Sequence, residues 1–156
     1  MLARSTRERR RSWLRYVTTL AALLIGAACG GDSTPPQISE AGTYNLTSVN
    51  GQSLPVTITG TTLGTVVIQS ATLVLTSGNP STFSATINGT AAGGASTTLV
   101  SAGGTYVRSG TSLTFNATGS PIPFTGTVDN NGHVVVALPG QVIGTTATLQ
   151  LDLVKS

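Results

Sequence analysis

The sequence predicts an all-β protein, an antiparallel meander of about eight to ten short strands. Three observations lead to this fold class. After Cys29 the chain holds one Glu, one Lys, one Arg and no Met, so several of the residues that favour helices are scarce. The same part is rich in Thr, Val, Ser and Gly, which favour strands and the turns between them. From Thr43 onward apolar residues alternate with polar ones, and turn residues interrupt the alternation at short intervals.

The alternation divides the chain into segments that each present one apolar face. Asn50-Gly51, Asn88-Gly89, Ser109-Gly110 and the stretch 129–132 separate several of these segments, because Asn and Gly tolerate a positive φ. The stretch 129–132, Asp-Asn-Asn-Gly, is the strongest turn signal in the chain, and His133 is expected at the strand end beside it. The segments from which these strands are expected to form are 43–49, 54–59, 65–68, 71–76, 82–87, 97–101, 104–108, 112–116, 122–128, 133–138 and 147–155.

The short connections favour pairing between strands that follow one another in the sequence. A meander of this length is expected to close into an up-and-down barrel, because closure leaves no exposed strand edge. The first strand, 43–49, should then pair with the last, 147–155. The alternative is a two-sheet β-sandwich. The apolar positions are mostly Val, Leu and Ile with few aromatic residues, so an eight-stranded barrel is expected to be incompletely filled.

The N-terminal part of the chain has the pattern of an export signal. An arginine-rich segment precedes a short apolar run from Thr18 to Ile25. This run is about half of the roughly 20 residues that a spanning helix needs, which indicates a signal peptide and not a permanent span. Gly26-Ala27-Ala28-Cys29 resembles the lipobox of bacterial lipoproteins, and the resemblance implies that Cys29 becomes an acylated N-terminus carrying chains such as palmitate. The alternative is an ordinary secretory signal in which Cys29 has no role.

The charge of the chain is unevenly distributed. Residues 1–28 hold six arginines and one glutamate, a net charge of +5, whereas residues 29–156 hold two cations and four acids, a net charge of −2. The two parts together give the +3 of the whole chain. Without the signal no basic patch remains, so we expect no nucleic-acid partner.

The titratable residues after residue 42 do not form a recognisable catalytic or metal-binding pattern. No serine lies in a Gly-x-Ser-x-Gly nucleophile elbow, and the turn at 129–132 lacks the later acid of a calcium loop. We therefore expect no enzyme, no metal and no cofactor. The titratable residues concerned are Arg108, Asp129, His133, Asp152 and Lys155.

The domain resembles the lipocalin-like domains of small bacterial lipoproteins. The similarity rests on Gly42-Thr43-Tyr44 at the first strand, where true lipocalins have Trp at the position of Tyr44. It also rests on the hairpin Gly-Thr-Tyr-Val-Arg…Ser-Leu-Thr-Phe within 104–115 and on the meander from 43 to 155. The resemblance implies a cup for a small apolar or amphipathic ligand, without chemistry of its own. Tyr44, Tyr106 and Arg108 are the candidate polar contacts, and the last two share one face of a strand.

The chain is thus expected to have three parts: a lipoprotein signal peptide (1–28), a flexible tether (29–42) and a single β-barrel domain (43–155). We expect a bacterial cell-envelope lipoprotein, held at the inner or outer membrane through acylated Cys29. Its domain would lie in the periplasm or at the cell surface and bind a small apolar ligand. The alternative function is a structural or interaction module that docks on envelope proteins or on itself.

Overall fold

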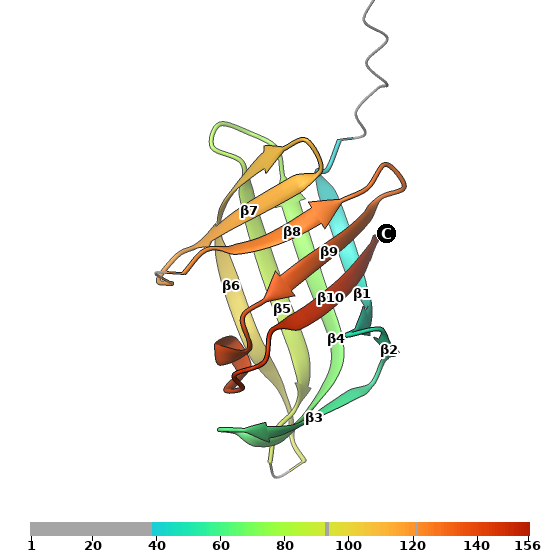
Figure 1. The fold of residues 1–156 in the computed structure, drawn as a ribbon, viewed down its shortest axis with the longest axis vertical. Coiled ribbons are helices and arrows are strands. Elements are labelled where there is room, and N and C mark those ends of the chain that lie inside the picture. The colour runs from blue at the N-terminus through green and yellow to red at the C-terminus, as the bar shows by residue number, and fades with distance from the viewer. Residues whose placement is uncertain (1–38, 93, 121) are drawn as a thin grey trace, which may run out of the picture. The chain divides into compact units, whose positions relative to one another are not determined.

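The computed structural model describes residues 39–92, 94–120 and 122–156, which form ten strands and one short 3-10 helix (Figure 1). The predicted signal peptide, Cys29 and most of the predicted tether lie outside the described residues. The elements are β1 (Gly42–Val49), β2 (Gln52–Ser53), β3 (Val56–Thr61), β4 (Gly64–Thr76), β5 (Thr82–Thr90), β6 (Ser96–Ser109), β7 (Ser112–Ala117), β8 (Phe124–Val128), β9 (His133–Leu138), η1 (Gly140–Ile143) and β10 (Leu149–Lys155).

Eight of the strands close into an antiparallel, lipocalin-like barrel. The strands pair in the order β1, β10, β9, β8, β7, β6, β5 and β4, and β4 returns to β1. Tyr44 of β1 lies opposite Lys155 of β10 on one side and opposite Leu73 of β4 on the other. The expected all-β meander and the pairing of the first and last strands are therefore confirmed, and the chain does not adopt the two-sheet alternative. The remaining strands, β2 and β3, pair with β1 and β4 respectively.

Two of the predicted turns have the expected backbone. Asn50 and Gly51, between β1 and β2, have φ values of 50° and 76°, as a tight turn with two positive φ angles requires. In the turn after β8, a side-chain oxygen of Asp129 accepts hydrogen bonds from the backbone N–H groups of Asn131 (2.8 Å) and His133 (2.9 Å). The aspartate thus satisfies the donors that the turn leaves free.

Other strand boundaries differ from the prediction. Asn88-Gly89 does not end a strand but lies within β5, where both residues pair with β6. The segments predicted at 97–101 and 104–108 form one strand, β6, because its middle residues pair with β5, as Ala102 does with Ala85. Pairing with a neighbour therefore overrides the weak strand preference of the Ala-Gly-Gly stretch. The segments 65–68 and 71–76 likewise form one strand, β4, with a register shift between Ile68 and Ser70.

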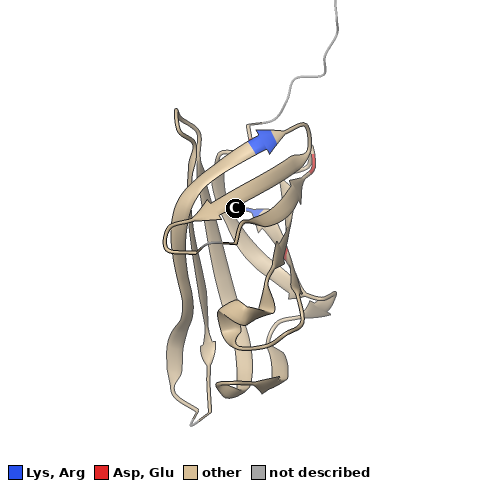
Figure 2. Ribbon diagram, turned by 60° about the vertical axis from the view of Figure 1, so that its left-hand side comes forward, with Lys and Arg blue, Asp and Glu red and all other residues tan. Residues whose placement is uncertain are grey.

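All charged side chains of the described residues lie at or near one end of the barrel, which we call the charged end. This end holds the start of β1 and the ends of β6, β8 and β10. The opposite end, the uncharged end, holds β2, β3, the loop between β5 and β6, and η1. Residues 41–107 contain no Asp, Glu, Lys, Arg or His at all, and Figure 2 shows the blue and red segments confined to the upper part of the barrel. The charged residues are Glu40, Arg108, Asp129, Asp152 and Lys155, and His133 lies near them.

The barrel wall is incomplete toward the uncharged end. β7 pairs only with residues 104–109 of β6, so residues 96–103 have no strand partner on that side in the described part of the chain. The loop after β7 leaves the sheet there, and the backbone N–H of Thr118 donates to the carbonyl of Gly103 at 2.8 Å. Further down, η1 lies beside β6 (Figure 1). A loop and a short helix therefore stand where a strand would complete the wall.

Inward side chains fill the two halves of the barrel differently. Nearer the charged end, the ring of Phe115 stacks on Phe124 (centroids 4.8 Å apart) and meets Phe83 edge-on (5.2 Å). Phe115 also contacts Tyr106, so the rings of the neighbouring strands β5 to β8 form one aromatic cluster. Toward the uncharged end, four neighbouring strands each place one alanine inward among larger apolar side chains. These alanines are Ala71, Ala85, Ala102 and Ala117, which we call the alanine band.

Candidate functional site

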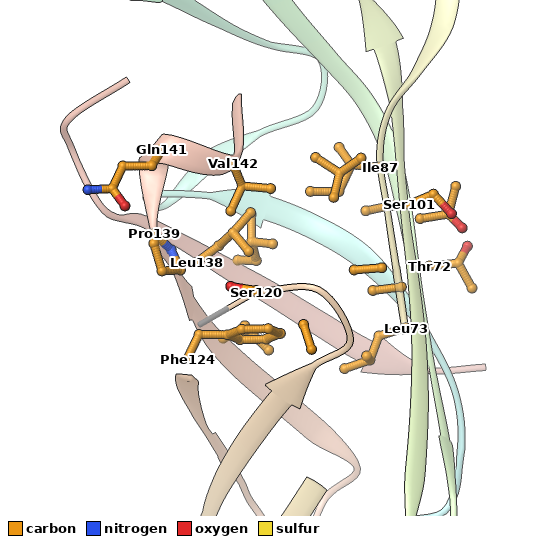
Figure 3. A pocket seen from close by; sticks show the side chains of 18 of the residues that line it. Thr72, Leu73, Ile87, Ser101, Ser120, Phe124, Leu138, Pro139, Gln141 and Val142 are labelled. Carbon is orange, nitrogen blue, oxygen red and sulfur yellow. The ribbon is translucent and has the colours of Figure 1, made fainter. Parts of the chain in front are cut away.

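A cavity of about 410 Å³ lies inside the barrel beside the alanine band. Its volume falls within the range of about 300–1,000 Å³ that is usual for small-molecule sites. The wall is mostly apolar, and Figure 3 shows Leu73 and Ile87 facing Phe124, Leu138 and Val142 across the space. The main apolar contributors besides the alanine band are Leu73, Ile87, Val100, Ile122, Phe124, Val136, Leu138, Val142, Leu151 and Leu153.

The cavity follows from the size of the inward residues. On β5 the inward order is Phe83, Ala85, Ile87, and on β6 it is Val100, Ala102, with Ala85 opposite Ala102 in the register. Because paired residues on adjacent strands lie at the same level of the barrel, small side chains meet small side chains there. An interior packed to ordinary density would require longer side chains at this level. The expected incomplete filling is therefore localised to one band.

The opening of the cavity is rimmed by two exposed apolar side chains, which we call the lip. Ile122, in the loop between β7 and β8, is 50 % exposed, and Val142, in η1, is 44 % exposed. Both also line the cavity. Large apolar side chains at a cavity mouth favour the approach of an apolar ligand, because the ligand covers them when it binds.

The polar residues of the wall present few hydrogen-bonding groups to the cavity. The side chains of Thr72 and Ser101 point away from it, as does that of Gln141 (Figure 3). The hydroxyl of Ser120 bonds within its own loop, donating to the carbonyl of Ile122 at 3.2 Å. No buried side-chain nitrogen or oxygen among the described residues lacks a hydrogen-bond partner. The interior of the cavity therefore makes no demand for a polar ligand group.

At the charged end, four residues form a second arrangement, which we call the charged cluster: Glu40, Tyr44, Tyr106 and Arg108. Arg108 Nη1 lies 2.6 Å from Glu40 Oε2, and these two side chains are only 15 % and 17 % exposed. The hydroxyl of Tyr106 donates to the other carboxylate oxygen at 3.2 Å. The hydroxyl of Tyr44 donates to the backbone carbonyl of Glu40 at 2.6 Å. The segment before β1 is thus fixed across this end of the barrel.

The charged cluster shifts the acidity of its members. Burial raises the pKa of Glu40, but the backbone hydrogen bond at Glu40 and the hydrogen bond and charge of Arg108 outweigh it, so this pKa lies below its usual value of 4.5. Burial, together with the negative charge of Glu40, raises the pKa of Tyr44 and of Tyr106 above 10.0. At neutral pH the carboxylate is therefore ionised and both phenols keep their protons, which suits the bonds they donate.

Tyr44, Tyr106 and Arg108, the candidate ligand contacts, are brought together by the fold but do not line the cavity. Ligand contact at these three residues stays a prediction, and it would occur at the charged end, outside the cavity. Cys29 lies outside the described residues, so its acylation also stays a prediction.

Two features of the site were not predicted from the sequence. Glu40 was expected in the tether, yet it is the partner of Arg108 inside the barrel end. A pairing signal was present, because Arg108 faces inward and Glu40 is the acid next to the first strand. The alanine band was also missed, since only the folded barrel shows that Ala85 lies opposite Ala102 and that alanines of four neighbouring strands line one cavity.

Within residues 39–92, 94–120 and 122–156, no three His, Cys, Asp or Glu side chains gather where they could hold a metal ion. The same residues contain no helix that is long and apolar enough to cross a membrane.

The fold and the cavity together define the class: a lipocalin-like, eight-stranded antiparallel barrel with an internal, mostly apolar cavity. The chain matches no protein-family model, no curated protein and no solved structure. What this barrel does must therefore be argued from its own residues.

Proposed function

We propose that this protein is a bacterial cell-envelope lipoprotein, anchored through Cys29, whose barrel binds a small apolar or amphipathic molecule. The observation that carries the binding function is the cavity of about 410 Å³ with its apolar wall and exposed apolar lip. An unfilled apolar space inside a barrel lowers stability, since its lining loses packing contacts. A ligand in that space restores these contacts, which favours binding.

The anchor rests on the sequence, since the arginine-rich segment, the short apolar run and Gly26-Ala27-Ala28-Cys29 have the order of a lipoprotein signal. Two or more acyl chains, at about 0.8 kcal/mol for each buried methylene, would hold the protein firmly at a membrane. The alternative function, an interaction module without a ligand, fits less well with an open apolar cavity.

Ligand binding is tested with the neutral, apolar fluorescent probe N-phenylnaphthylamine and the soluble domain. We expect saturable binding with enhanced probe fluorescence. The variant Ala102→Leu places a larger side chain in the cavity and should weaken binding at least tenfold. The control Ser84→Leu adds the same side chain to the outward face of β5 and should leave the affinity unchanged. Equal affinity of the two variants would show that the probe does not enter the cavity.

The anchor is tested by fractionation of cells that make the full chain. Wild type should separate with the membranes, and mass spectrometry should find acyl chains on Cys29. Cys29→Ser should release the protein into the soluble fraction or retain an uncleaved signal. If the variant is processed and fractionates as wild type does, the anchor proposal fails, whereas the binding proposal does not depend on this result.

A further inference from the structure

We propose that the cavity selects an uncharged ligand, such as a long-chain alcohol, an ester or a hydrocarbon, and discriminates against ionised amphiphiles of either sign. The inference rests on the proposed ligand-binding function and specifies its ligand class. It follows from the positions of the charged residues in the barrel and from the ion pairs and hydrogen bonds that its polar groups already make.

The wall of the cavity carries no charge. None of the residues that line it is Asp, Glu, Lys, Arg or His. The charged residues of the described chain lie toward the charged end of the barrel (Figure 2). Asp152, which stands between the cavity-lining Leu151 and Leu153, belongs to the other face of β10. An ionised head group that enters the cavity therefore loses water and finds no opposite charge, which is strongly unfavourable.

The cations of the described chain, Arg108 and Lys155, are already engaged at the charged end. Arg108 pairs with Glu40 and also donates from Nε to the carbonyl of Gly110 at 2.8 Å. Lys155 donates from Nζ to the carbonyl of Ser39 at 3.1 Å and lies 5.9 Å from the ring centre of Tyr44. A carboxylate or phosphate ligand would have to recruit one of these groups from its present partners.

The mouth of the cavity, where the head group of an amphiphile would emerge, is also uncharged. The lip consists of Ile122 and Val142, which are apolar and about half exposed. A charge held beside such side chains is partly desolvated, whereas a hydroxyl or ester loses much less on transfer from water. The carbonyls and hydroxyl of the loop around Ser120 offer neutral polar contacts at this place. A neutral head group is therefore compatible with the mouth.

The expected discrimination follows from the linkage between binding and protonation. A carboxyl group whose pKa rises by one unit on binding has an ionised form that binds about tenfold more weakly than its neutral form. For fully ionised ligands we therefore expect a loss of about tenfold or more, relative to a neutral ligand with the same chain.

The experiment compares decanol, decanoate and decylammonium as competitors of N-phenylnaphthylamine at about pH 7. These ligands share an alkyl chain and differ in the charge of the head group. We expect decanol to bind at least tenfold more tightly than either ion. The domain after the signal is net negative, so bulk attraction would favour decylammonium, and weak binding of both ions would identify desolvation as the cause.

Ile122→Lys sharpens the test, because it places a cation at the lip without changing the buried wall. This variant should recover affinity for decanoate and not for decanol. The control Leu63→Lys adds the same charge at a residue that is 46 % exposed in the turn between β3 and β4 and does not line the cavity. It should leave the preference unchanged.

The outcomes separate this inference from the proposed function. If decanoate or decylammonium binds wild type as tightly as decanol, selection for uncharged ligands is wrong while ligand binding stands. If Leu63→Lys alters the preference as much as Ile122→Lys, the lip is not where the head group lies, and the inference fails. If the fluorescent probe itself does not bind, the proposed function fails first.

Discussion

The interior of the eight-stranded barrel is packed differently toward its two ends. The charged end is closed by aromatic rings and by the Glu40–Arg108 pair, whose distance is 2.6 Å. Toward the uncharged end, the alanine band faces the interior and a cavity of about 410 Å³ remains. The strands β4, β5 and β6 run through both ends, so the difference arises from side-chain size and from where the shorter strands stop.

This difference indicates a division of roles within one fold. Packing at the charged end supplies cohesion, because large buried rings contribute most to stability. The uncharged end gives up part of that packing and gains space for a ligand. Substitutions at the charged end should therefore change the free energy of unfolding, whereas substitutions around the cavity should change ligand affinity.

The largest expected effect comes from removing a ring at the charged end. Phe115 is fully buried and contacts Phe83, Phe124 and Tyr106. Phe115→Ala should lower the free energy of unfolding by about 3–5 kcal/mol, because it leaves a cavity among these rings. Urea denaturation followed by circular dichroism measures the change. A loss below about 1 kcal/mol would mean that the aromatic cluster does not hold the barrel together.

Adding a side chain at the other end should have the opposite sign. Ala85 borders the cavity opposite Ala102, so the larger side chain of Ala85→Leu has unoccupied space to enter. We expect the free energy of unfolding to rise by about 0.5–2 kcal/mol, as cavity-filling substitutions commonly achieve. The same denaturation experiment measures it. A decrease of about 1–3 kcal/mol would instead indicate overpacking and would contradict the described cavity.

The pH dependence of the free energy of unfolding should also differ between the two ends. The pKa of Glu40 is lower in the folded barrel than its usual 4.5, so its stabilising contribution is present above this value and is lost as pH falls through the folded pKa. At neutral pH, Glu40→Gln should lower the free energy of unfolding by about 1 kcal/mol, since the pair is partly exposed. Below pH 4.5 the difference between variant and wild type should shrink.

Urea denaturation at neutral and at acidic pH measures this dependence. Comparing Glu40→Gln with wild type cancels the titration of Asp129, whose pKa is also lowered, mainly because its carboxylate accepts a hydrogen bond from the backbone N–H of His133. A difference that stays constant with pH would show that the ionised form of Glu40 contributes nothing through Arg108. No matching titration is expected at the uncharged end, where the described residues carry no charge.

Local signals in the sequence were sufficient to predict the fold class. The alternation of apolar and polar residues predicted most of the strands, and the turn at Asn50-Gly51 formed as expected, whereas Asn88-Gly89 lies within β5. Closure through the first and last strands was predicted because a closed barrel leaves no exposed strand edge, and the two strands do pair. The strand β6 was divided in the prediction because Ala102, Gly103 and Gly104 have little strand preference, and only pairing with β5 shows its continuity.

The site was less predictable than the fold, for a geometric reason. A one-residue change of register turns every side chain of a strand to the other face, so the inward level of an alanine is unknown without the pairing. Glu40 lies outside the alternating segments, and its partner Arg108 is 68 positions away in sequence. Long-range pairs of this kind depend on the closure of the whole barrel.

The smallest effect on stability is expected at the lip, where the effect on binding should be clear. Ile122 is 50 % exposed, so Ile122→Ser should change the free energy of unfolding by less than about 0.5 kcal/mol. A bound apolar ligand covers part of this side chain, and its loss should weaken probe binding about fivefold, equivalent to about 1 kcal/mol of covered apolar surface. Fluorescence titration with N-phenylnaphthylamine measures the affinity. Val107→Ser is the matched control, because Val107 is 62 % exposed on β6 and does not line the cavity. Equal losses of affinity in both variants would contradict a mouth at Ile122, whereas a loss confined to Ile122→Ser would place ligand entry at the uncharged end.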